Sequence, residues 1–266
     1  MRSGRLYLRY LEISIKGQMQ YHTSFVLQSI GSFLGTGIEF LGLWALFDRF
    51  GNLKGWELPE VALFYGIVNV AFSVSEAFTR GFDVFAGFVK SGDFDRILLR
   101  PRSTILQLAG HEVTLKRIGR FTQGAVILVW ALVSLEIPIT AHKILLIFIS
   151  ISGGTFLFSG LLIFQAGLCF WTTESLEIVN TVTYGGAETM QYPLSIYRRF
   201  FRRFFIFIVP LGCVCYFPVV SILGKIDPLG APPITGWLSP LAGFAFFFLA
   251  IGFWRIAMRR YSSTGS

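Results

Sequence analysis

Two carboxylates, Glu39 and Glu76, are the residues whose type and position could support chemistry, because each interrupts a long apolar run. A carboxylate inside a membrane is costly unless it is paired or hydrated, so such residues face a bundle interior or a water-filled cavity. For Glu76 we favour a structural contact, a hydrogen bond or an ion pair, for which Arg80 is available one helical turn away. A position on a translocation pathway or subunit interface is the alternative for Glu76. For Glu39, a structural contact and a position on a translocation pathway or subunit interface are both open.

Residues for nucleotide, nucleophilic or metal chemistry do not occur at the required spacings. Gly224-Lys225 is followed by isoleucine, so the chain has no phosphate-binding loop of the form G-x-x-x-x-G-K-[ST]. It contains neither G-x-S-x-G nor H-E-x-x-H, and its three histidines lie in different segments. We therefore expect no catalytic residues, no metal site and no cofactor in this chain.

Composition predicts the elements that must position these residues. Hydrophobic residues make up 53% of the 266, and charged residues only 14%, against about 25% in soluble domains. The mean hydropathy is +0.63. Apolar runs long enough to cross a hydrocarbon core of roughly 30 Å recur along the chain. This predicts an all-α polytopic membrane protein, one domain over residues 1–266. The six predicted transmembrane helices lie near Ser24–Phe47, Glu60–Thr79, Phe121–Glu136, Ile144–Trp171, Phe204–Ile222 and Trp237–Trp254.

The distribution of the 23 Lys and Arg residues predicts the orientation. With these helix boundaries, 19 lie on one side of the membrane and 4 on the other. Cytoplasmic loops of membrane proteins carry the excess of Lys and Arg. We therefore expect both termini in the cytoplasm, and anionic lipid head groups as counter-ions for the net charge of +8.

Two basic segments adjoin predicted spans. Within residues 1–23 the charges recur every three or four residues, which predicts an amphipathic helix in the membrane interface; the alternative is a solvated helix. Within Arg198–Arg203, arginines line one helical face and phenylalanines the other. This pattern can bind nucleic acid, but its place beside a span favours anionic lipid, and we expect no nucleic-acid partner. The predicted lipid contacts are Arg2, Arg5, Arg9, Lys16, Arg198, Arg199, Arg202 and Arg203.

The segment after the second predicted span, Arg80–Pro101, interleaves phenylalanines with charged residues. Phe82, Phe85 and Val89 share one helical face, and Asp93 is the predicted N-cap of a second short helix. The segment cannot span the membrane. Its phenylalanines must therefore be covered by a partner protein, by the membrane interface or by the chain's own bundle.

Residues 207–240 contain six prolines and four glycines. Proline removes a backbone donor and breaks a helix, so this region is predicted to be bent or re-entrant. Broken backbone at membrane depth is tolerated only where it is buried in protein or lines a cavity.

The whole chain resembles the membrane subunit of a type-2 ATP-binding-cassette (ABC) exporter, in particular the bacterial six-span permeases of about this length. The resemblance rests on the basic lead-in, the six spans, the Tyr192-Pro193 segment and the Trp254 and Tyr261 tail. It also rests on the run Asp93-Phe94-Asp95-Arg96-Ile97-Leu98-Leu99-Arg100-Pro101, in which Leu98-Leu99-Arg100-Pro101 is the most specific element.

The resemblance implies an interfacial helix in residues 1–23, a coupling-helix loop in 80–101 and an outward re-entrant region in 207–240. It further implies export across the bacterial inner membrane by a permease homodimer or heterodimer, driven by two copies of a separate ATP-binding subunit. An ATP-independent secondary transporter or ion pathway using Glu39 and Glu76 is the alternative, and a scaffold without transport is a third. The residues expected to contact the ATP-binding subunit are Phe82, Asp83, Phe85, Phe88, Asp93, Asp95, Arg96 and Arg100.

Overall fold

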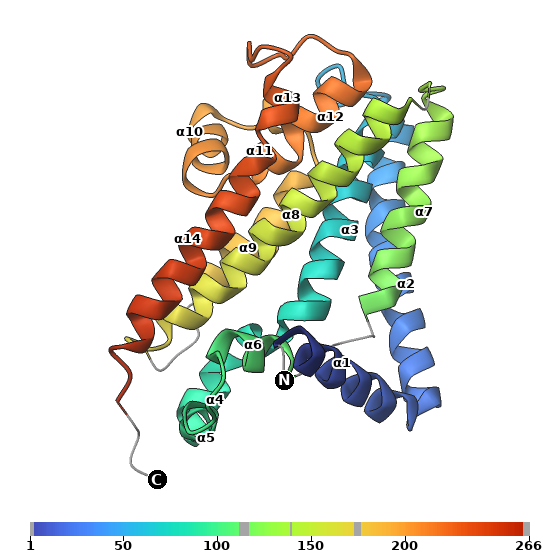
Figure 1. The fold of residues 1–266 in the computed structure, drawn as a ribbon. Coiled ribbons are helices and arrows are strands. Elements are labelled where there is room, and N and C mark those ends of the chain that lie inside the picture. Colours follow the sequence, from blue (N-terminus) through green and yellow to red (C-terminus); the bar gives the residue numbers. More distant parts are fainter. Residues whose placement is uncertain (1–2, 112–116, 139, 173–176, 263–266) are drawn as a thin grey trace.

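The computed structural model describes residues 3–111, 117–138, 140–172 and 177–262, and the named elements in these ranges are all helices. Long helices lie side by side (Figure 1). In that view the lower end of the bundle is formed by the short helices α4 (Phe85–Ser91), α5 (Asp93–Leu98) and α6 (Thr104–Ala109) and by the slanted α1 (Ser3–Met19). The helices α10–α13, within residues 199–238, form its upper end. Arg2 and the side chain of Arg5, two predicted lipid contacts, lie outside the described part of the chain.

Among the described residues, four helical stretches are long and apolar enough to cross a membrane. A bent helix pair raises the number to five if it is counted as one span, and α7 (Ile118–Ser134) is a shorter apolar helix. Helices therefore occur at five of the six predicted spans. The four stretches are α2 (His22–Phe50), α3 (Leu58–Asp83) continued by α4 (Phe85–Ser91), α8 (Ala141–Leu168), and α13 (Thr235–Leu238) continued by α14 (Leu241–Met258).

The predicted fifth span, Phe204–Ile222, is wrong as one helix. In its place Arg199–Ile208 and Leu211–Leu223 are joined at an angle of 77°. Pro210 lies in the break, where it removes a backbone donor. The pair comprises α10 (Arg199–Arg203), the π-helix η3 (Phe204–Ile208), α11 (Leu211–Val214) and α12 (Tyr216–Leu223).

Both ends of this bent region lie at the upper end of the bundle. Lys54 Nζ, in the loop between α2 and α3, donates to the carbonyl oxygen of Ile196 at 2.9 Å. After α12, Lys225 Nζ pairs with Glu60 Oε1 in the first turn of α3 at 2.5 Å. The segment therefore enters and leaves the bundle at the same end.

The chain passes from the lower to the upper end through α9 (Glu177–Met190), which the hydropathy pattern did not predict as a span. Tyr184 Oη donates to Asp83 Oδ2, at the lower end of α3, at 3.2 Å. Soon after α9, Ser195 Oγ accepts a hydrogen bond from Trp56 Nε1 in the upper loop at 3.0 Å. Polar residues in α9 dilute its hydropathy, which explains the missed helix.

This correction moves four arginines to the upper end of the bundle. Arg198, Arg199, Arg202 and Arg203 follow α9, whereas the sequence analysis placed them at the same end as α1. Of the Lys and Arg residues in the described ranges, 13 then lie toward the lower end and 8 toward the upper end, against the 19 and 4 predicted for the whole chain. The excess at the lower end persists, but it is smaller than predicted.

The helix α1 (Ser3–Met19) lies at an angle to α2 across the lower end (Figure 1). A Cβ atom on Gly110 would lie 2.7 Å from the ring of Tyr10, so α1 packs closely on the chain after α6 (Thr104–Ala109). Glu12 and Lys16 form an exposed ion pair that lowers the pKa of the Glu12 carboxyl. The contact of Arg9 and Lys16 with lipid stays a prediction.

The helices α8 and α14 cross at a pair of glycines. A Cβ atom on Gly243 would lie 2.1 Å from the carbonyl oxygen of Gly153, and one on Gly153 would lie 2.7 Å from that of Pro240. Both distances are too short for a Cβ atom, so this crossing requires glycine. Small residues at helix interfaces allow such close approach in membrane proteins.

Gly243→Val is expected to force α14 away from α8 and to destabilise the protein by about 1–3 kcal/mol, the usual cost of overpacking. The measurement is the midpoint of thermal unfolding in detergent. Gly252→Val is the matched control, because a Cβ there has no neighbour within 4 Å. An equal loss in both variants would show that helix propensity, and not the crossing, causes the effect.

Candidate functional site

Polar side chains of α3 and α7 meet inside the bundle at three levels. The two helices run in opposite directions. Going along α7, residues at successive steps of three therefore meet residues progressively earlier in α3. The contacts join Arg117 Nη2 to Glu76 Oε1 at 2.6 Å, Arg120 Nε to Asn69 Oδ1 at 2.7 Å, and Gln123 Nε2 to Tyr65 Oη at 3.1 Å.

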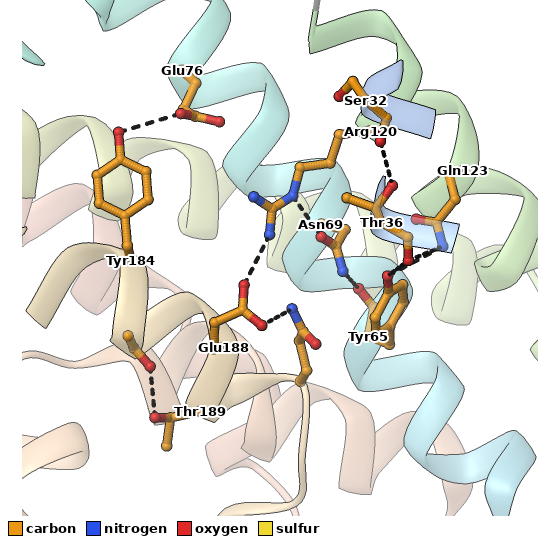
Figure 2. Close-up of polar contacts among 12 residues, drawn as sticks. Ser32, Thr36, Tyr65, Asn69, Glu76, Arg120, Gln123, Tyr184, Glu188 and Thr189 are labelled. Carbon is orange, nitrogen blue, oxygen red and sulfur yellow. Dashed lines mark hydrogen bonds and ion pairs between the residues drawn. The ribbon is translucent and has the colours of Figure 1, made fainter. Parts of the chain in front are cut away.

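Arg120 is the centre of this polar network. Its guanidinium lies between Asn69 and Glu188 of α9 (Figure 2), and its Nη2 is 3.4 Å from Glu188 Oε1. The same group lies over the Phe72 ring, 4.7 Å from the centroid. The Arg120 side chain is only 11% exposed, whereas Glu188 is 52% exposed. The network therefore has a buried side on α3 and α7 and an open side on α9.

Glu39 of α2 lies near this open side. It is exposed, and it is close enough to Glu188 and Arg120 to interact with both electrostatically. The helix α2 buries only Thr36, Leu43 and Phe47, so most of its surface is left uncovered by this chain. Acidic and basic groups on an uncovered face of apolar helices can contact polar solutes or a second subunit.

The predicted pair of Glu76 with Arg80 is wrong. The Glu76 side chain is 2% exposed and pairs with Arg117, and its Oε1 also accepts a hydrogen bond from Tyr184 Oη at 3.4 Å. Thr79 has non-helical dihedral angles (φ −121°, ψ 16°), so α3 is kinked between Glu76 and Arg80. Arg80 pairs with Asp83 instead, and Asp83 also accepts the hydrogen bond from Tyr184.

Phenylalanines at the end of α3 and in the loop that follows it are covered by the chain's own bundle. Phe82, Phe85 and Phe94 are at most 1% exposed. They form a cluster with Trp254 of α14, whose ring centroid is 4.9 Å from that of Phe85. Phe82 and Phe85 were predicted to contact the ATP-binding subunit, but burial makes both inaccessible to a partner. Phe88 is half-buried, with its ring 4.7 Å from His111.

The large hydrophobic residues that this loop exposes lie in its tip, which we define as Leu98, Leu99 and Arg100. Leu99 is 85% exposed and Leu98 is 41% exposed. The tip begins with the last residue of α5 (Asp93–Leu98) and is flanked by the exposed Arg96, which pairs with Asp93 at 3.3 Å. Two adjacent exposed leucines among basic side chains are typical of a protein-binding surface.

Two details of the loop differ from the prediction or extend it. The N-cap of α5 is Gly92, whose φ of 74° suits glycine, and Asp93 is the first helical residue. Asp95 lies beside Tyr261 in the tail after α14. Burial, together with the neighbouring carboxylate, raises the pKa of Tyr261 to about 12.

Several residues of the polar network were missed by the sequence analysis. Arg117, Arg120, Tyr184 and Glu188 all lie outside the six predicted spans. A charged residue within a turn or two of an apolar run is the signal that was available for Arg120. No such signal marked Tyr184 or Glu188, because α9 itself was not predicted.

The bundle and its buried charged network define the class as a helical, multi-pass membrane protein. In the described residues no group of three or more His, Cys, Asp and Glu side chains is arranged to hold a metal ion. The family model described as ABC-2 family transporter protein matches residues 33–265, and the chain belongs to this family. It is the membrane component of an ABC-2 transporter. Members of this membrane family are typically permeases that lack the ATPase domain. No curated protein and no solved structure matches the chain.

Proposed function

We propose that this chain is the permease subunit of an ABC export system in the bacterial inner membrane. A separate ATP-binding subunit, present in two copies, docks on the tip at Leu98–Arg100. The substrate crosses along the uncovered face that carries Glu39 and Glu188, with the largely buried Arg120 beside them. Export as the direction rests on the resemblance of the sequence to type-2 exporters.

The observation that carries the proposal is this uncovered charged face between α2 and α9. Charged groups that face lipid are costly, so the face requires either water or another protein surface beside it. A second permease, identical or homologous, supplies the opposite wall and encloses a polar route between two copies.

The proposed topology has six spans, with α9 in place of the predicted fifth. The spans are α2, α3, α7, α8, α9 and α14, and the bent segment α10–α12 is re-entrant from the outer side. The remaining excess of Lys and Arg at the lower end supports a cytoplasmic location for α1, for the loop after α3 and for both termini.

The contacts of the lower end provide a route for coupling. Asp83 ends α3 directly before the loop, pairs with Arg80 and accepts the Tyr184 hydroxyl of α9. A partner that moves the loop on ATP binding displaces α3 and α9 together. Because α9 carries Glu188, such a movement changes the width of the proposed route.

Cysteine accessibility tests the proposed route without knowledge of the substrate. Glu39→Cys and Glu188→Cys are expected to react with a charged, membrane-impermeant methanethiosulfonate about tenfold faster than Leu41→Cys, because the reactive thiolate forms in water. Leu41 is the matched control, an exposed apolar residue of α2. Of the native cysteines, Cys169 and Cys215 are buried and Cys213 is half-buried, so background labelling should be low.

The state dependence of labelling separates the alternatives. With the ATP-binding subunit present, trapping with ADP and vanadate should change the labelling rates of Glu39→Cys and Glu188→Cys and leave Leu41→Cys unchanged. Equal rates at all three positions would refute the route. A response to the proton gradient but not to nucleotide would favour the secondary transporter.

A further inference from the structure

A cavity of about 540 Å³ at the upper end has no part in the proposed route. It lies between the N-terminus of α8, one side of α12, and the loop between α12 and α13 with the start of α13. Apolar side chains, among them Phe217, Val220 and Trp237, form much of its wall. His142 and Lys143 of α8 line it as well.

The loop that forms one wall of the cavity is held in place by Asp227. Its Oδ1 accepts hydrogen bonds from Tyr216 Oη at 2.6 Å and from the Leu229 backbone N–H at 3.0 Å. Its Oδ2 accepts the Ala231 N–H at 2.9 Å. Since Pro232 and Pro233 follow, this wall has little freedom to collapse into the cavity.

Three charged side chains line the cavity, and two of them are engaged elsewhere. Lys225 pairs with Glu60 at 2.5 Å and lies 5.0 Å from the Trp56 ring centroid. Both carboxylate oxygens of Asp227 are occupied by the donors described above. The half-buried Lys143 ammonium has no hydrogen bond or ion pair to any described residue, and the N-terminus of α8 adds partial positive charge.

The mouth of the cavity is apolar, because Ile226 and Ile234 are both exposed there. A cationic group on the wall and hydrocarbon at the mouth together match an amphiphile. We propose that this cavity binds a molecule with a phosphate or carboxylate head group on Lys143 and an acyl chain against Ile226 and Ile234. Two sources share this chemistry, a lipid of the surrounding leaflet and an exported amphiphile. The inference does not depend on the proposed route.

Retention of phosphatidylglycerol by the purified full-length chain tests the site. The chain is transferred from nanodiscs containing phosphatidylglycerol and phosphatidylcholine into mild detergent, and bound lipid is counted by native mass spectrometry. Lys143→Gln should reduce bound phosphatidylglycerol about fivefold, the effect of one basic group at a lipid surface. Lys54→Gln is the matched control, an exposed lysine of the same end that lies outside the cavity. Equal retention in the wild type and Lys143→Gln would overturn the proposal.

Two further arms test the acyl chain and the source. Glycerol 3-phosphate in excess should leave the lipid bound. Displacement by this head group alone would show that the acyl chain contributes nothing to binding, and would overturn the proposal that the cavity binds an amphiphile. Ala231→Leu, which narrows the cavity without changing its charge, should also reduce retention, and normal retention would contradict binding inside it. Occupancy that changes under ADP and vanadate with the ATP-binding subunit present supports an exported amphiphile as the source, and unchanged occupancy supports a resident lipid.

Discussion

Arg117→Met is expected to destabilise the protein by about 3–5 kcal/mol, the cost of leaving one member of a buried ion pair without its partner. Removal of Arg117 leaves the Glu76 carboxylate without its ion-pair partner, and the Glu76 side chain is only 2% exposed. The Tyr184 hydroxyl at 3.4 Å is too distant to compensate for the lost charge. The expected readouts are a lower midpoint of thermal unfolding and a reduced yield from membranes.

The opposite single variant should be milder. Glu76→Gln keeps a neutral group that accepts the Tyr184 hydrogen bond, and the Arg117 side chain, which is 26% exposed, retains contact with solvent. Arg117→Met combined with Glu76→Gln should recover most of the loss, because no buried charge remains. A double variant as unstable as the two single losses added together would show that the side chains do not interact.

Leu98→Glu combined with Leu99→Glu is expected to weaken binding of the ATP-binding subunit by at least about a hundredfold. Burial of one leucine contributes roughly 1.5–3 kcal/mol, so two leucines account for about 3 kcal/mol or more. The measurement is co-purification of the ATP-binding subunit and the ATPase activity that it shows with the permease. The thermal midpoint of the permease itself should not change, because both side chains are exposed.

Two comparisons make this result specific. Leu8→Glu places the same substitution on α1, where Leu8 is also exposed at the lower end, and should leave binding intact. Phe85→Ala should lower the stability of the permease, because Phe85 is a core residue and not a contact. If the double glutamate variant binds the ATP-binding subunit as tightly as the wild type does, the tip is not part of the docking surface.

The sequence predicted that the protein is a helical membrane protein. It also predicted the apolar helices and the amphipathic start of the chain. Hydropathy and charge spacing are local properties, and a run of apolar residues is a helix candidate whatever surrounds it. For the same reason α9 was missed. Its polar residues find partners on other helices, such as Arg120 for Glu188, which are 68 residues apart in the sequence.

The sequence by itself determined the class of protein, the absence of a nucleotide-binding loop and the position of most helices. Tertiary structure decided that Glu76 pairs with Arg117, that the loop phenylalanines are buried in their own bundle, and that Arg198–Arg203 lies at the upper end. Each of these depends on which distant segment comes to lie beside the residue. Burial and charge pairing are properties of such contacts, and residue order along the chain does not specify them.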